Sequence, residues 1–262
     1  MFKTRLLSGI VLVIILIATV GTGGGLLFGF LALISLIGLS ELYKVVDVQN
    51  KILGLTGYLG AVVYYGILYT GQMQYVTLLT IAFLVVLMAV YVFSFPTFKA
   101  EQVMTVFFGV FYVAVMLSYV YQTRMLEDGA VAVWLIFLSS WGCDTCAYCA
   151  GMLLGKHKMA PVLSPKKSVE GAVGGVVGAA LLTLIYGFLF RGSMHVDVPY
   201  IFMMAGICAA GALISMVGDL AASAIKRNFD IKDYGKLIPG HGGILDRFDS
   251  VIFTAPIIFY LT

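Results

Sequence analysis

The chain consists of long apolar runs separated by short polar segments. Residues 6–40 contain no charged side chain, and the next such run covers residues 52–98. A helix that crosses a bilayer needs about 20 apolar residues, so each run is long enough for two helices. Glycine-rich residues 21–25 and the polar stretch 70–74 supply the breaks. The pattern therefore predicts two helical hairpins in the N-terminal part of the chain.

Further apolar spans follow along the rest of the chain. They cover approximately 104–122, 130–153, 171–190, 200–222 and 251–262. The last is short for a full crossing, which leaves three alternatives: the helix tilts, the bilayer thins around it, or Phe248 and Ser250 extend it backwards. The pattern predicts an all-α integral membrane protein, a polytopic bundle of about nine transmembrane helices.

The composition agrees with this fold class and excludes a soluble core. Hydrophobic residues make up 61% of the chain, and charged residues only 11%, against about 25% in soluble domains. Lys3 and Arg5 before an apolar run also fit a signal peptide. However, the run continues into a second apolar helix without a clear cleavage site of small residues.

The basic residues predict how the chain is oriented. Of the 16 Lys and Arg residues, only Arg124 and Arg191 fall in loops on the side opposite the N-terminus. Since cytoplasmic loops carry the excess of Lys and Arg, we expect the N-terminus and the large polar loops to be cytoplasmic. An odd number of spans then places the C-terminus outside.

Two polar segments stand out against this apolar background, residues 154–170 and 223–250. Both fall on the expected cytoplasmic side. We therefore divide the chain into N-terminal membrane helices, residues 1–125, and a C-terminal catalytic region with both polar loops, residues 126–262. The charges expected at the cytoplasmic mouth of the helices are candidates for an active site.

Two acids lie inside otherwise apolar spans, Asp144 and Asp219. A carboxylate at membrane depth costs about 2.5–3.5 kcal/mol on insertion, so it normally faces a cavity, a cation or a partner. A structural ion pair within the bundle is the plain alternative. An ion-coupled transporter that uses both acids would predict a site near the bilayer midplane and inverted repeats.

Further polar residues are spaced so that they share helix faces. If the helix through 200–222 continues, Asp219, Ser223 and Lys226 lie on one face. Asp246 and Asp249, three residues apart, share a face if they begin the last helix. Carboxylates that converge in this way suit Mg²⁺, which commonly takes phosphate and water oxygens as its other ligands.

Basic residues near these acids are candidates for binding phosphate groups. They are Lys156, Lys158, Lys166, Lys167, Lys226, Arg227 and Arg247. Their alternative role is attraction to anionic lipid heads, and that role is the better interpretation for Lys44, Lys51 and Lys99. Glycines on both sides of His241 allow a close approach to a ligand or a plain tight turn.

Other motifs are incomplete. Residues 151–157 resemble a phosphate-binding Walker loop but are one residue short and lack a hydroxyl after the lysine. Cys143, Cys146 and Cys149 would form a stripe along a helix, and a zinc site would need a fourth ligand. We expect these small thiols to pack inside the helix bundle instead.

The second polar segment carries a pattern with intact spacing throughout. It consists of Ser223, Lys226, Arg227, Lys232, Asp233, Gly235, Pro239, His241, Gly242, Gly243, Asp246, Arg247 and Asp249. This pattern resembles the signature of the phosphatidate cytidylyltransferases, also called CDP-diacylglycerol synthases. Residues 144–171 resemble the same family, with Ser168 where a threonine is common and unusual cysteines around Asp144. Residues before 126 resemble the family only in being membrane helices.

The resemblance implies a reaction and its partners. Phosphatidic acid and CTP would give CDP-diacylglycerol and pyrophosphate, with Mg²⁺ and possibly K⁺ as a second cation. It also implies a homodimer, with no nucleic-acid partner. We expect a bacterial source, and thus the bacterial cytoplasmic membrane, because the chain lacks a long soluble extension. A CDP-alcohol phosphotransferase is disfavoured because its acidic pattern stops at Asp128-Gly129. A scaffolding role would leave the signature unexplained.

The resemblance also implies roles for individual residues. The expected metal ligands are Asp219 and Asp246, with Asp144 and Asp249 supporting the metal or orienting the basic residues. The residues expected to hold phosphates are Lys226, Arg227 and Arg247. The residues expected on the nucleotide side are Lys166, Lys167, Ser168 and Glu170. Ser223 is a further substrate-binding candidate, and His241 is expected to order the glycine-rich turn.

Overall fold

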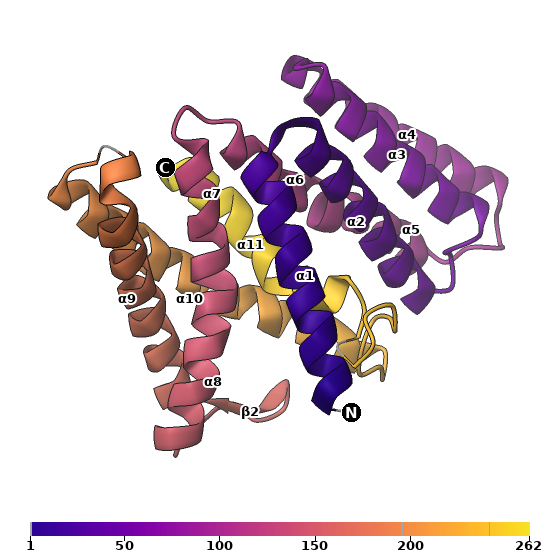
Figure 1. Ribbon diagram of the computed structural model, residues 1–262. Coiled ribbons are helices and arrows are strands. Elements are labelled where there is room, and N and C mark those ends of the chain that lie inside the picture. The colour runs from indigo at the N-terminus through magenta and orange to yellow at the C-terminus, as the bar shows by residue number, and fades with distance from the viewer. Residues whose placement is uncertain (1, 195, 241) are drawn as a thin grey trace. The chain divides into compact units, whose positions relative to one another are not determined.

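The computed structural model describes residues 2–194, 196–240 and 242–262 (Figure 1). Contacts between residues divide the chain into two compact units. Unit 1 contains Met1–Tyr121 and Asp233–Arg247, and unit 2 contains Gln122–Lys232 and Phe248–Thr262. The second half of the signature thus belongs to the same compact unit as the N-terminal helices. The functional division at residue 125 remains a prediction.

Unit 1 is built from helices. They are α1 (Phe2–Thr22), α2 (Gly24–Val45), α3 (Ile52–Tyr69), η1 (Met73–Tyr75), α4 (Val76–Phe93), α5 (Ala100–Gly109), the π-helix η2 (Val110–Val115) and the first part of α6 (Met116–Arg124). The expected breaks are confirmed. Gly24 and Gly71 have φ angles of 52° and 70°, a left-handed backbone that glycine adopts without steric cost.

Helices α2, α3, α4 and α5 lie side by side in unit 1 (Figure 1). Their buried tyrosines use hydroxyl groups to link neighbouring helices. Tyr65 and Ser35 join α3 to α2 across 2.8 Å, and Tyr64 and Ser118 join α3 to α6 across 2.8 Å. A polar group in an apolar bundle needs such a partner, because no water is there to replace it.

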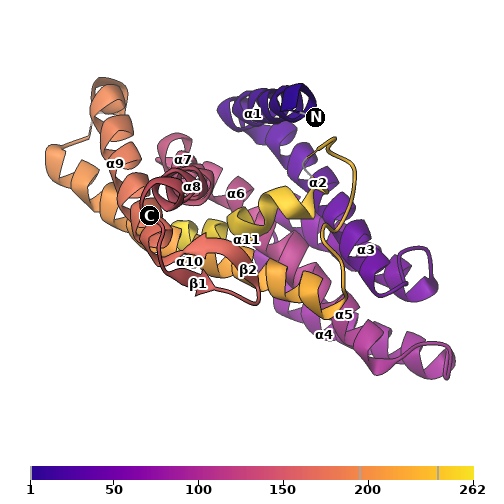
Figure 2. The ribbon, with the colours of Figure 1, turned by 90° about the horizontal axis from the view of Figure 1, so that it is seen from below.

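Unit 2 combines helices with one β-hairpin. Its elements are α7 (Gly129–Phe137), the π-helix η3 (Leu138–Gly142), α8 (Cys143–Leu154), β1 (Lys158–Ala160), β2 (Ser164–Ser168), α9 (Val169–Met194), α10 (Val198–Asn228) and α11 (Leu245–Leu261) from Phe248 onwards. The hairpin occupies the first polar loop, and β2 contacts α8 and α9. Its antiparallel strands appear as a pair in Figure 2.

Helices α8 and α9 approach each other closely through small residues. A Cβ atom added at Gly174 would lie 2.3 Å from the Cβ of Ala150, and one added at Gly178 would lie 2.4 Å from the Cβ of Cys146. Glycine is therefore required for this helix spacing. Cys143 is fully buried in the same region. The expectation of thiols packed inside the bundle is confirmed for buried Cys143 and for half-buried Cys146, and it is wrong for Cys149, which is exposed.

The fold class is confirmed as an all-α polytopic bundle. Within the described residues, seven helices are long and apolar enough to cross a membrane. The two other expected spans are shorter: the apolar part of α1 covers Leu7–Thr22, and α11 has 17 residues. Helix α11 begins at Leu245, so the backward extension through Phe248 is the one of the three alternatives that the structure shows.

The contact between α8 and α9 yields a stability prediction. Gly178→Ala forces a methyl group against Cys146 and should destabilise the protein by about 1–3 kcal/mol. Gly206→Ala in α10 is the matched control, because nothing lies within 4 Å of the added methyl. The measurement is the temperature at which detergent-purified protein loses its monodisperse peak. Equal midpoints for the two variants would contradict the close packing.

Candidate functional site

Ser168 links the hairpin to α9. Its Oγ accepts a hydrogen bond from the backbone N–H of Gly171 at 3.1 Å, as an N-cap residue does. The side chain is buried, and a Cβ atom at Gly155 would lie 2.7 Å from its Oγ. The hydroxyl therefore fixes the start of α9, and its expected place on the nucleotide side stays a prediction.

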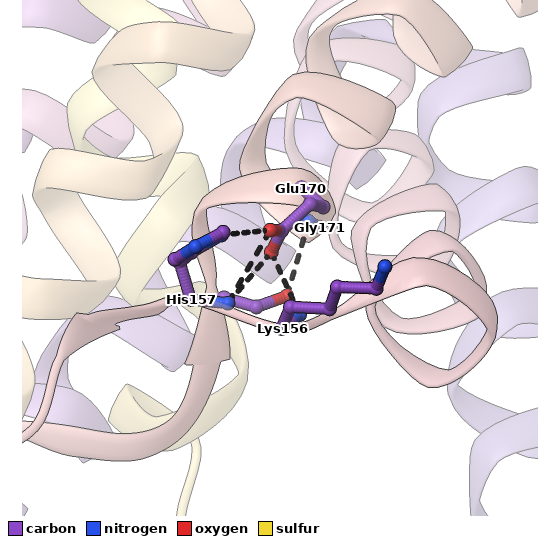
Figure 3. A network of polar contacts seen from close by, with 5 residues as sticks. Lys156, His157, Glu170 and Gly171 are labelled. Carbon is purple, nitrogen blue, oxygen red and sulfur yellow. Dashed lines mark hydrogen bonds and ion pairs between the residues drawn. The ribbon is translucent and has the colours of Figure 1, made fainter.

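Glu170 fastens the end of α8 to the first turn of α9 (Figure 3). Its carboxylate accepts hydrogen bonds from the backbone N–H groups of Lys156 at 3.0 Å and His157 at 3.2 Å. The Nδ1 atom of His157 lies 2.5 Å from Oε1 of the same carboxylate. Glu170 thus fixes the backbone that leads into the hairpin, and its expected place on the nucleotide side stays a prediction.

Four charged residues of unit 2 form a cluster, which we call the acid–lysine cluster: Asp144, Lys167, Asp219 and Asp249. Lys167 on β2 makes an ion pair with Asp219 on α10. Burial lowers the pKa of Lys167 below its usual 10.5, while the negative charges of Asp144 and Asp249 act in the opposite direction. The structure therefore gathers three of the predicted acids around one predicted lysine.

Close packing and an irregular helix place these acids. A Cβ atom at Gly218 would lie 2.9 Å from the backbone oxygen of Asp249, so α10 and α11 touch beside Asp219. Asp144 is the second residue after η3, and a π-helical turn changes which face the next residues occupy. Ser250 Oγ donates to Asp144 Oδ2 at 3.4 Å, which ties α11 to the start of α8.

The end of α10 carries the first half of the signature. The helix continues to Asn228, so Asp219, Ser223 and Lys226 share one face, as the spacing predicts. Lys226 lies close enough for its charge to lower the pKa of Lys167 further. Arg227 is exposed, and basic residues in a last helical turn interact favourably with the helix dipole.

The second half of the signature, residues 233–247, lies in unit 1, and we call it the signature turn. Asp246 is its organising residue. Its Oδ2 atom accepts hydrogen bonds from the backbone N–H groups of Tyr234 at 2.8 Å and Gly243 at 2.9 Å. Gly242 has a φ of 90° and lies against the same carboxylate. Asp246 therefore orders the turn, a role expected of His241, which falls outside the described residues.

The predicted site residues thus form two groups. Asp144, Lys167, Asp219 and Asp249 come together in unit 2, and Asp246 and Arg247 belong to unit 1. Lys166 is exposed on β2. Joint metal ligation by Asp219 and Asp246 remains a prediction, because the two acids belong to different units. Across the described parts of the chain, no three His, Cys, Asp or Glu side chains are arranged to hold a metal ion.

Sequence reasoning missed Glu41. This acid lies near the end of α2, its side chain is buried, and its carboxylate accepts hydrogen bonds from the signature turn. The available signal was weaker than for Asp144 and Asp219, because Glu41 directly follows the apolar run of residues 6–40 and does not lie inside an expected span. Nothing in the local sequence indicated its partners.

The chain is similar to known proteins along almost its whole length. The model of the cytidylyltransferase family matches residues 3–262. A phosphatidate cytidylyltransferase of Staphylococcus epidermidis is 34% identical, with 98% of this chain and 97% of that protein covered. The enzymes of the same name from Bacillus subtilis and Staphylococcus haemolyticus are each 32% identical, over 99% and 98% of this chain and 97% of each relative. With a match that covers almost every residue, including both polar segments, the chain belongs to the cytidylyltransferase family.

Proposed function

We propose that this protein is a phosphatidate cytidylyltransferase. It transfers CMP from CTP to phosphatidic acid and gives CDP-diacylglycerol and pyrophosphate. The observation that carries the proposal is the acid–lysine cluster, which sets cationic and anionic groups beside the polar hairpin of an otherwise apolar protein. The activity named for relatives that match the whole chain supports the same conclusion.

The reaction needs such charges. A phosphate oxygen of phosphatidic acid attacks the α-phosphorus of CTP, a new P–O bond forms, and the bond to pyrophosphate breaks. Both reactants are anions, so basic groups must screen their repulsion and stabilise the leaving pyrophosphate. Lys167, Lys226, Arg227 and Arg247 are the residues assigned to this screening. The phosphate monoester is already nucleophilic at neutral pH, so a general base is unnecessary.

The carboxylates of the acid–lysine cluster have the donor chemistry of a magnesium site, and no three acidic, cysteine or histidine side chains of the described residues are grouped to hold the ion by themselves. In the acid–lysine cluster, the carboxylates already surround a cation, the ammonium group of Lys167, and carboxylate oxygens are the donors that Mg²⁺ prefers. Asp219 and Asp246 are the assigned ligands, with water and substrate phosphate oxygens completing the set. When bound, the ion would neutralise charge on the departing pyrophosphate. A second cation such as K⁺ and a homodimeric state are also part of the proposal.

The membrane setting fits the two substrates. Phosphatidic acid stays in the bilayer, whereas CTP is soluble, so the reacting groups must meet where the helices end. We assign the hairpin and the N-terminus to the cytoplasmic side because most Lys and Arg residues fall on that side. Membership of the cytidylyltransferase family supports this enzyme over the ion-coupled transporter that Asp144 and Asp219 suggested in isolation.

The first prediction concerns Asp246. Purified protein with phosphatidic acid, Mg²⁺ and α-labelled CTP should produce labelled CDP-diacylglycerol. Asp246→Asn should lower this activity at least about 100-fold, because it replaces a carboxylate assigned as a Mg²⁺ ligand with a neutral amide that binds the ion more weakly. Asp230→Asn is the matched control: Asp230 is exposed, and its φ of 52° is a conformation that asparagine readily adopts.

Three outcomes of this assay separate the ideas. If the parent and Asp230→Asn are active and Asp246→Asn is not, the assay supports both the reaction and the role of Asp246. An active Asp246→Asn variant would show that this carboxylate is dispensable. A well-folded parent that labels no lipid acceptor would contradict the proposed reaction, and ion transport in vesicles would then be measured.

The second prediction concerns pH. Burial lowers the pKa of Lys167, so this lysine loses its proton at a lower pH than an exposed lysine does. The charged form makes the ion pair with Asp219, and activity should therefore fall as the pH rises through that pKa. Arginine keeps its proton up to about pH 12, so Lys167→Arg should move the alkaline decline of kcat to higher pH. Exposed Lys99→Arg should leave the profile unchanged, and an identical decline in Lys167→Arg would refute the assignment.

The third prediction concerns orientation. In a Cys149→Ser background, Val162→Cys places a thiol in the hairpin, where the native side chain is 84% exposed. A membrane-impermeant maleimide should label it only after spheroplasts are lysed. Gln72→Cys, in the turn between α3 and α4, should be labelled in intact spheroplasts. The reverse pattern would place the hairpin outside the cytoplasm.

A further inference from the structure

Glu41 on α2 reaches the signature turn, which lies about 200 residues away in sequence. We propose that Glu41 is a positioning residue: it fixes the start of α11 and thereby holds Asp246 in its working orientation. The inference rests on the proposed function for its kinetic consequence, although its structural part can be tested without the reaction. All the contacts that carry it lie within unit 1.

The hydrogen bonds are specific for a carboxylate. Oε1 accepts from the backbone N–H of Ile244 at 3.0 Å, and Oε2 accepts from that of Leu245 at 2.8 Å. The first N–H groups of a helix have no partner within the helix, and Leu245 is the first residue of α11. Glu41 therefore caps α11 from another helix, and its negative charge also suits the helix dipole.

The turn is shaped around this carboxylate. A Cβ atom added at Gly235 would lie 2.2 Å from Oε1 of Glu41, and one added at Gly243 would lie 2.4 Å from both carboxylate oxygens. Neither glycine has a positive φ. Glycine is thus needed at these two positions for space rather than for an unusual backbone, and the space is taken by Glu41.

The same few residues connect Glu41 to Asp246. Gly243, Ile244 and Leu245 are consecutive: the first donates its N–H to Asp246, and the next two donate theirs to Glu41. Two carboxylates therefore hold one short stretch of backbone from both sides. Ser8 Oγ on α1 adds a tether, since it donates to the backbone oxygen of Pro239 at 3.0 Å.

Burial shows that Glu41 does more than fill space. Its side chain is 8% exposed, and burying a carboxylate is unfavourable unless hydrogen bonds compensate for the lost water. An apolar side chain of similar size would fill the same volume without that penalty. The carboxylate is therefore explained by the two amide groups that it fixes, and through them by the orientation of Asp246.

Kinetics and hydrogen exchange together test the proposal. Glu41→Gln keeps the volume but presents an amide N–H₂ group to one of the two donors. We expect kcat to fall about 10- to 100-fold, because hydrogen bonds to a charged group are lost, while the KM for CTP changes little. Amide hydrogen exchange should become faster in residues 233–247 and stay unchanged in α3 and α4. Glu101→Gln, at an exposed acid of α5, is the matched control.

A double-mutant cycle checks the shared space. Gly235→Ala alone should lower kcat, because its methyl group pushes the carboxylate of Glu41 aside. In a Glu41→Ala background that methyl group has room, and the same substitution should then have a much smaller effect. Non-additivity of this kind is expected only for residues that interact directly.

The outcomes are distinct. Parental kcat and parental exchange in Glu41→Gln would overturn the proposal, as would strictly additive effects in the cycle. Loss of kcat with a matching fall in thermal midpoint and faster exchange throughout unit 1 would show a general structural role and also overturn it. If the parent makes no labelled lipid, the proposed function fails. Hydrogen exchange is then the remaining test of the positioning role, and faster exchange of residues 233–247 in Glu41→Gln than in the parent supports it.

Discussion

Carboxylates hold both of the large polar segments of this apolar chain, because their oxygens bind backbone amides or a lysine ammonium group. Asp246 and Glu41 each accept two amide hydrogen bonds within the first unit. In the second unit, Glu170 accepts amides at the entry to the hairpin, and Asp219 pairs with Lys167. A buried or half-buried carboxylate without such a partner would strongly destabilise the fold.

The same polar side chains that hold the backbone in place are also the ones to which a chemical role is assigned. Ser168 caps α9 and Glu170 fastens the preceding loop, although the resemblance assigns both to the nucleotide side. Asp246 orders the signature turn with one oxygen atom and is also the assigned metal ligand. Such preorganised groups need little rearrangement when a charged substrate arrives, and preorganisation is the largest electrostatic contribution to catalysis in many enzymes.

The N-terminal helices have a role beyond anchoring the protein. Residues 233–247 belong to the same compact unit as α1–α5, where Glu41 and Ser8 contact them. The signature turn therefore depends on residues that carry no recognisable motif. If Glu41 positions Asp246 as proposed, a substitution in α2 changes the reaction without contacting either substrate.

Local sequence patterns determined the helices, their breaks at residues 21–25 and 70–74, the polar segments and the shared face of Asp219, Ser223 and Lys226. Hydrophobicity and helical periodicity depend only on residues close together in the sequence, so a single stretch of chain is enough to predict a helix from them. Only the tertiary structure decided that Lys167 pairs with Asp219 and that Glu41 caps α11. The sequence pattern also did not predict the π-helical turn before Asp144 or the β-hairpin. Partners separated by 50 to 200 residues are chosen by packing between helices, and no local repeat encodes that choice.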